Sequence, residues 1–136
     1  GSVYQAGTLS GNPLAVAVGI ATLRYLRTHP PYAMLEKTSG QLAGGLSRLL
    51  QSAGIAHQLN RVGSMMTLFF TSHEVASFED AMRCDTDRFA AFHRAMLKEG
   101  VYLPPSQYEA WFVSTAHAPE IIDDTLDRMA RAIRKI

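Results

Sequence analysis

The most informative stretch of the chain reads Gln5-Ala6-Gly7-Thr8-Leu9-Ser10-Gly11-Asn12-Pro13. Gly7 and Gly11 lack a Cβ and let the backbone approach a ligand closely, while Thr8 adds a hydroxyl to the exposed N–H groups. Asn12 and Pro13 are typical of a helix N-cap and a first helical residue, so we expect the positive end of a helix dipole nearby. The run therefore predicts a loop that can bind an anion such as phosphate. The same residues are also typical of a turn that only caps a helix.

The composition indicates one compact domain with no special affinity for polyanions. The chain has 136 residues, of which 47% are hydrophobic, and this is enough to form a core. A formal net charge of +1 gives no electrostatic reason to expect nucleic acid or an anionic membrane as a partner. The single cysteine, Cys84, cannot form an internal disulfide, and the sequence shows no signal segment or membrane-spanning run. We therefore expect a cytoplasmic location.

The first part of the chain predicts two long helices. Residues 13–28 are apolar on most sides, so we expect this helix to be largely enclosed by protein. Residues 32–52 carry a leucine stripe, and Gly54 fits a left-handed stop after it. Three further glycines weaken this second helix by about 1 kcal/mol each relative to alanine. The helix must therefore depend on packing or on the close approach of a neighbour at these glycines, which are Gly40, Gly44 and Gly45.

The remaining residues alternate between strand and helix periods. Strands are predicted over residues 57–61, 64–70, 101–103 and 111–115, and a loop or short helical turn over residues 78–84. A further helix begins at Asp85 or Thr86 and stops at Gly100, and a last one begins at Pro119. The inward-facing residues of these two helices are expected to be Phe89, Phe92, Met96, Ile122, Leu126, Met129 and Ile133. This order predicts an α+β fold, with a small, mainly antiparallel sheet of about three to four strands packed against helices.

Two motifs that lie far apart in the chain point to one family. The first is Gly7-Thr8-Leu9-Ser10-Gly11-Asn12-Pro13, and the second runs from Gly100 to Ala110 and continues through Phe112-Val113-Ser114 and Ala116-His117. Together they resemble the class III aminotransferases, which use pyridoxal phosphate, and within that family the aminomutases. The resemblance covers nearly the whole chain but only the C-terminal part of these longer enzymes. We therefore expect the chain to be a C-terminal fragment.

The resemblance implies that this chain and a larger domain each supply part of the cofactor site of a fold-type I pyridoxal-phosphate enzyme. Residues 1–12 would form a phosphate-contacting loop, and residues 13–136 a single small C-terminal domain with its leading helix. Gly7 and Thr8 would contact the phosphate of pyridoxal 5'-phosphate or pyridoxamine 5'-phosphate across a homodimer interface. A large cofactor-binding domain, absent from this chain, would supply the Schiff-base lysine and the aspartate at the pyridine nitrogen. The fragment alone is therefore expected to have no catalytic residue and no activity.

Other polar residues are not expected to carry chemistry. The lysines Lys37, Lys98 and Lys135 lie on predicted exposed helix faces or before a helix stop, where solvated surface charge is the ordinary role. The five histidines have no spacing typical of a metal site, so none is expected. His117 follows Ser114 by three residues, but no aspartate is placed to complete a hydrolase triad. A structural hydrogen bond is the expected role of His117.

Glu109 is the residue expected to contact substrate. From its position beside Tyr108 and Trp111, it could equally be a solvated loop carboxylate. Many class III aminotransferases have at the matching place an arginine that can clamp a substrate carboxylate, whereas the aminomutases have a glutamate, as this chain does. A carboxylate repels an α-carboxylate and attracts an amine, which suits the movement of an amino group between neighbouring carbons. Trp111 departs from the smaller residue found there in many members, which leaves the shape of the pocket open.

Two alternatives remain open from the sequence. The chain could belong to an ordinary class III aminotransferase that uses an external amino acid, although Glu109 argues against this. It could also be a non-catalytic interaction or phosphate-binding module. Whether the enzyme is an aminomutase or an aminotransferase, its expected partners are the large domain and a small-molecule substrate.

Overall fold

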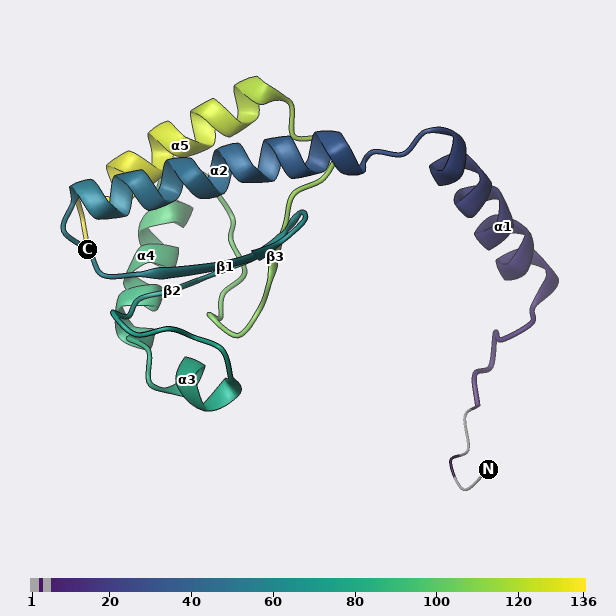
Figure 1. Ribbon diagram of the computed structural model, residues 1–136, viewed down its shortest axis with the longest axis horizontal. Coiled ribbons are helices and arrows are strands. Elements are labelled where there is room, and N and C mark those ends of the chain that lie inside the picture. Colours follow the sequence, from purple (N-terminus) through teal and green to yellow (C-terminus); the bar gives the residue numbers. More distant parts are fainter. Residues whose placement is uncertain (1–2, 4–5) are drawn as a thin grey trace. The chain divides into compact units, whose positions relative to one another are not determined.

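The computed structural model describes residue 3 and residues 6–136 (Figure 1). Gln5, which opens the loop motif, lies outside the described residues. The chain divides into two compact units, Gly1–Pro31 and Tyr32–Ile136. Among the described residues, no helix combines the length and apolar character that a membrane crossing requires.

The described part of the first unit is built around helix α1 (Pro13–Thr28), where the sequence predicts it. Asn12 is the N-cap, because its Oδ1 accepts hydrogen bonds from the N–H groups of Leu14 (3.0 Å) and Ala15 (3.2 Å). The prediction of an enclosed helix is wrong for this chain, since none of the described α1 residues is buried. No other described element of the unit covers the apolar side chains, which are Leu14, Val16, Val18, Ile20, Leu23 and Tyr25.

Helix α2 (Tyr32–Ser52) is the long helix of the second unit. Gly54 ends it with a φ of +68°, in the left-handed region that glycine adopts without a Cβ clash. Gly45 is where α2 meets α5 (Pro119–Ile133), because a Cβ added there would lie 2.5 Å from Cδ2 of Leu126. The expected close approach of a neighbour is therefore found at Gly45.

Three short antiparallel strands form the sheet, in the order β1 (Gln58–Val62), β2 (Met65–Phe69) and β3 (Trp111–Phe112). A tight turn at Gly63, whose φ is +58°, joins β1 to β2. The α+β class and the small antiparallel sheet are confirmed.

Two strand predictions need correction. Residues 101–103 are not a strand, because their backbone groups bond to helix α4 (Thr86–Lys98) instead. The N–H of Val101 donates to the carbonyl of Met96 (2.9 Å), and the carbonyl of Leu103 accepts from Nε2 of His93 (3.1 Å). The strand expected over residues 111–115 is shorter, since a turn closed by the N–H of His117 and the carbonyl of Ser114 (3.1 Å) follows it.

The main core lies between one face of the sheet and helices α2, α4 and α5. In Figure 1, α2 and α5 run side by side over the β1–β2 hairpin, and these two helices pack against each other. The residues predicted to face inward on α4 and α5 are buried, except Leu126, which is partly buried. The core side chains from the strand side are Met66, Leu68, Phe70, Trp111 and Val113.

The opposite face of the sheet carries a smaller layer. Phe69 packs there with Val75, Ala81 and Cys84. Ala81 belongs to the short helix α3 (Phe78–Met82), which the sequence predicts as a loop or helical turn. The cover is partial, because Met65 remains 41% exposed on this side. The β1–β2 hairpin thus separates a large core from a small one.

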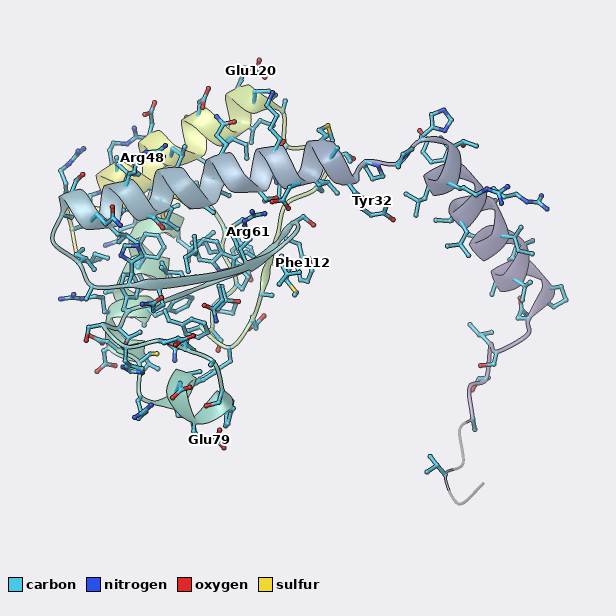
Figure 2. The ribbon with its side chains drawn as sticks, viewed as in Figure 1. Tyr32, Arg48, Arg61, Glu79, Phe112 and Glu120 are labelled. Carbon is cyan, nitrogen blue, oxygen red and sulfur yellow. The ribbon has the colours of Figure 1, made fainter. Side chains whose placement is uncertain are left out.

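A bidentate ion pair connects the hairpin to the start of α2. Arg61 of β1 lies between the hairpin and α2 (Figure 2). Its two terminal nitrogens donate to the Glu36 carboxylate at 2.9 Å and 2.5 Å, and Nη1 also donates to the carbonyl of Gly63 (2.7 Å). One guanidinium therefore holds both the helix and the hairpin turn.

A second ion cluster connects α4 to α5. The Glu99 carboxylate, just after α4, accepts from Nε of Arg131 at 2.7 Å and from Nζ of Lys135 at 2.5 Å. Arg128 of α5 also donates to the carbonyl of Glu99. The hydrogen bonds from Lys135 and Arg131 lower the pKa of Glu99 to about 2.

Alanine at Gly44 and at Gly45 should have opposite effects on stability. At Gly44 the nearest atom to an added Cβ is Nη1 of Arg48, at 3.4 Å, which is the mobile end of a long side chain. Gly44→Ala should therefore raise the free energy of unfolding by about 0.5–1 kcal/mol through helix propensity. Gly45→Ala should lower it by about 1–3 kcal/mol, because Leu126 must move out of a packed position. Urea unfolding measures both variants, and a gain in both would show that Leu126 moves aside without cost.

The Glu99 cluster should make stability depend on acid pH. The pKa of Glu99 is lower in the folded chain than its ordinary value of 4.5, so the folded state binds this proton more weakly than the unfolded state. The stabilisation is thus complete above pH 4.5 and lost as the pH falls toward 2. Glu99→Gln should lower the urea midpoint at neutral pH, and its difference from the unmodified chain should shrink on acidification. The exposed Glu74, changed to Gln, is the control. An equal pH dependence in both variants would contradict the role of the cluster.

Candidate functional site

The predicted anion-binding loop forms two linked turns at the entry to α1. The N–H of Ser10 donates to the carbonyl of Gly7 (3.0 Å), and the N–H of Asn12 donates to that of Leu9 (3.0 Å). Gly11 has a φ of +77°, which explains why glycine stands there. Thr8 lies within the first of these turns and is exposed, as Gly7 is. The loop therefore presents Thr8 to solvent on a backbone that its own hydrogen bonds hold.

The hydrogen bonds of Asn12 decide which groups of this loop can bind an anion. Its Oδ1 accepts hydrogen bonds from the N–H groups of Leu14 and Ala15. These two helical donors are therefore not available to an anion. For the hydroxyl and N–H of Thr8, the described residues supply no acceptor. An exposed hydroxyl and an N–H near a helix N-terminus fit a phosphate oxygen, so the donor set suits the expected cofactor phosphate.

The Glu109 loop lies in the second unit, between the end of α4 and β3. The N–H of Glu109 donates to the carbonyl of Ser106 (3.1 Å), and the N–H of Tyr108 donates to Oγ of Ser106 (3.2 Å). These bonds form a turn over residues 106–109. Glu109 is exposed, and its carboxylate bonds to none of the residues that the structure describes. The carboxylate is therefore open to a ligand.

Gln107, which anchors this loop, was not a candidate from the sequence. It is only 2% exposed, and its Nε2 donates to the carbonyl of Ala81 in α3 (2.9 Å). The ring of Tyr108 lies against that of Phe78, also in α3, with 5.8 Å between centroids. A glutamine in a loop that follows two prolines is ordinarily exposed, so no local pattern could have identified its burial.

Trp111 is part of the core, and this fixes the shape of the neighbouring cavity. It is 5% exposed and pairs with Met66 across the sheet. It borders a cavity of about 270 Å³ whose other walls are mostly apolar and include Leu42, Leu103 and Ile122. The larger side chain thus fills space inside the domain.

His117 makes the structural hydrogen bond that we expect from the sequence. The N–H of Ser114 donates to Nδ1 of His117 (2.9 Å), so this nitrogen is an acceptor and the proton of a neutral ring sits on Nε2. The hydroxyl of Ser114 lies 3.2 Å from the same nitrogen. The pair closes the turn that follows β3. Among the described residues, no group of three or more histidine, cysteine, aspartate or glutamate side chains could hold a metal ion.

The lysines that the sequence assigns to the surface all belong to the second unit. Lys37 and Lys98 are exposed, and Lys135 is paired with Glu99. Gly7 and Thr8 belong to the first unit, whereas Glu109 belongs to the second.

Comparison with known proteins gives a consistent set of relatives, although no family model matches the chain. The chain is 51% identical over all 136 residues to the glutamate-1-semialdehyde 2,1-aminomutase of Aquifex aeolicus, and covers 32% of that protein. It is 52% identical to the enzyme of the same name from Desulfatibacillum aliphaticivorans, again over the whole chain and 32% of the relative. An enzyme of Thermus thermophilus with the same name is 49% identical over 134 residues, which are 98% of this chain and 32% of the relative. The chain therefore spans about a third of the length of the curated relatives it matches.

Two solved structures share the fold of nearly the whole chain. An omega-transaminase from Sphaerobacter thermophilus matches 98% of this chain and 30% of its own, with a TM-score of 0.77 and 21% identity. The FumI protein of Sphingopyxis sp. MTA144, solved in a PLP form, matches 97% of this chain and 29% of its own, with a TM-score of 0.72 and 26% identity. The first likeness establishes the fold alone.

Proposed function

We propose that this chain, a member of the glutamate-1-semialdehyde 2,1-aminomutase family, is part of an enzyme that converts glutamate-1-semialdehyde to 5-aminolevulinate. The observation that carries this proposal is the identity of 51% along all 136 residues with the Aquifex aeolicus enzyme of that name. The product would serve as a tetrapyrrole precursor in the cytoplasm. The partner of this chain would be the large cofactor-binding domain of the same enzyme, which acts as a homodimer.

The cofactor of the proposed enzyme is pyridoxal 5'-phosphate or pyridoxamine 5'-phosphate. The PLP form of FumI supports this assignment. When bound, such a cofactor supplies an electron sink and a carrier for the amino group. The contribution of this chain is to hold the phosphate, with Gly7 leaving room for close approach and Thr8 donating from its hydroxyl and N–H. Hydrogen bonds to a charged phosphate are stronger than those between neutral groups.

Glu109 would select and orient the substrate amine. Its exposed carboxylate attracts a protonated amine and repels the α-carboxylate of an ordinary amino-acid donor. The proposed role is electrostatic, so it needs the charge of the side chain and its place in the loop. These two requirements, charge and position, distinguish Glu109 from the many exposed carboxylates that are only hydrated by solvent.

The aminotransferase alternative has weaker support. The omega-transaminase of Sphaerobacter thermophilus shares 21% identity with this chain, against 49% to 52% for the aminomutases. Glu109 also argues against an arginine-type clamp for an external amino acid. A non-catalytic module has no specific observation in its favour.

Removal of the Thr8 hydroxyl should weaken cofactor retention. In the full-length enzyme that contains this chain, Thr8→Ala should cost roughly 1.5–3 kcal/mol of cofactor binding, because the lost bond is to a charged group. Equilibrium dialysis against pyridoxamine 5'-phosphate measures the affinity. Ser10→Ala, which removes a hydroxyl from the same pair of turns, is the matched control and should bind normally. Equal affinities for the two variants would remove Thr8 from the phosphate site.

Changes at Glu109 should separate aminomutase from aminotransferase chemistry. Glu109→Gln in the full-length enzyme should depress conversion of the semialdehyde, because the charge that attracts the amine is gone, while cofactor affinity stays unchanged. Glu109→Arg should also raise half-transamination with glutamate, because a guanidinium can clamp a dicarboxylate. The absorbance change on formation of pyridoxamine 5'-phosphate follows this half-reaction.

The same assays can contradict the proposed role of Glu109. Full semialdehyde conversion in both variants, with no change in reactivity toward glutamate, would leave Glu109 as a loop carboxylate. An unmodified full-length enzyme that transaminates glutamate but does not convert the semialdehyde would instead overturn the aminomutase assignment.

A further inference from the structure

We propose that Gln107 is a positioning residue that fixes the Glu109 loop on α3 and so sets where the Glu109 carboxylate lies relative to the substrate amine. This inference rests on the proposed function, because it assigns Gln107 a role in the same site. Gln107 would touch neither substrate nor cofactor, and would act only through Glu109.

The first support is the place of the anchor within the turn. Gln107 stands between Ser106 and Glu109, whose backbone hydrogen bond of 3.1 Å closes the turn. The Gln107 Nε2 donates to the carbonyl of Ala81 at 2.9 Å, across 26 residues of sequence. Because a carbonyl can only accept, the side-chain amide cannot rotate by half a turn without placing two oxygens together. One directional bond thus fixes both the position and the rotation of the turn that carries Glu109.

The second support is that the acceptor sits on a segment held in place from several sides. Ser77 and Asp80 form a capping box at the start of α3, and Asp80 also accepts from Arg83. Hydrogen bonds from the Ser77 hydroxyl, the Ala76 N–H and Arg83 lower the pKa of Asp80 to about 2, so this cap stays ionised. Ala81 itself is buried in the layer behind β2. The carbonyl that receives Gln107 is therefore a fixed point.

A third observation separates anchoring from simple packing. Gln107 Oε1 is buried with no hydrogen-bond partner among the described residues. A buried polar atom without a partner destabilises the fold, whereas leucine or methionine would fill this space without that cost. The amide is therefore a poor choice for packing and a good one for a directional bond. The Phe78 and Tyr108 rings, 5.8 Å apart, add an adaptable contact but no comparable direction.

A double-mutant cycle in the full-length enzyme tests the inference. Gln107→Leu should lower kcat/KM for glutamate-1-semialdehyde about tenfold, the effect expected from the loss of one positioning hydrogen bond. In a Glu109→Gln background the same change should have almost no further effect, because Gln107 acts only through Glu109. Ser39→Ala is the control and should leave kcat/KM unchanged. Ser39, like Gln107, is a buried polar residue, but it lies on α2. Losses that simply multiply in the double variant would assign Gln107 a general structural role and overturn the inference.

A conservative variant tests whether a donor at position 107 is what the anchoring bond needs. In Gln107→Glu, an ionised carboxylate would face the Ala81 carbonyl, whereas the protonated acid can donate as the amide does. The activity of this variant relative to the unmodified enzyme should therefore recover as the pH falls, while that of Gln107→Leu should not. Parallel pH profiles for the two variants would contradict the anchoring bond.

The 136-residue chain itself provides a test that does not depend on activity. Hydrogen exchange of the Glu109 N–H, followed by NMR, should be faster in Gln107→Leu and unchanged in Ser39→Ala, since only the first variant releases the turn. Unchanged exchange in Gln107→Leu would overturn the inference even if the enzyme is an aminomutase. Faster exchange in an enzyme without semialdehyde activity would instead retain the anchor and reject the proposed function.

Discussion

The close contact between α2 and α5 at Gly45 is the constraint on which the second unit depends. The missing Cβ lets Leu126 lie against the backbone of α2, so the two helices can jointly cover the inner face of the hairpin. Glu99 then attaches α4 to α5 through Arg131 and Lys135. The segment that returns from α4 to β3 begins against α4, where the N–H of Val101 donates to the carbonyl of Met96 and the carbonyl of Leu103 accepts from Nε2 of His93. The same segment then carries the Glu109 loop to β3.

Periodicity and end signals predicted most of the helices because these are local properties. Asn12, Asp85, Gly54 and Gly100 mark helix ends in the sequence and do so in the structure. Residues 101–103 show the limit of such patterns, because an apolar triplet is typical of a strand whether or not a partner strand is free. Here the N–H of Val101 completes the helix end at Gly100 by donating to the carbonyl of Met96, and the carbonyl of Leu103 accepts from His93, a contact that only the tertiary structure reveals.

The site was less accessible to sequence reasoning than the fold. Gly7 and Thr8 became candidates through the glycine-punctuated loop before α1, and the resemblance to a family gave them their proposed role. Glu109 became a candidate through the resemblance alone, since an exposed glutamate carries no signal of its own. Gln107 could not be found at all, because its partner is a backbone carbonyl 26 residues away. The exposure of α1 was also unpredictable, since an apolar helix indicates burial but does not say which polypeptide provides the cover.

The layer behind β2 gives the chain a chemical reporter of its own opening. Cys84, the single cysteine, is buried there, and burial raises the pKa of its thiol above the usual range. The thiolate, not the thiol, attacks an alkylating reagent, so the folded chain should react slowly. The rate of labelling consequently measures how often this layer separates from the sheet. Ala81, whose carbonyl accepts from Gln107, shares this layer with Cys84. The labelling rate of Cys84 would therefore report how rigidly α3 is held against the sheet, without any introduced probe.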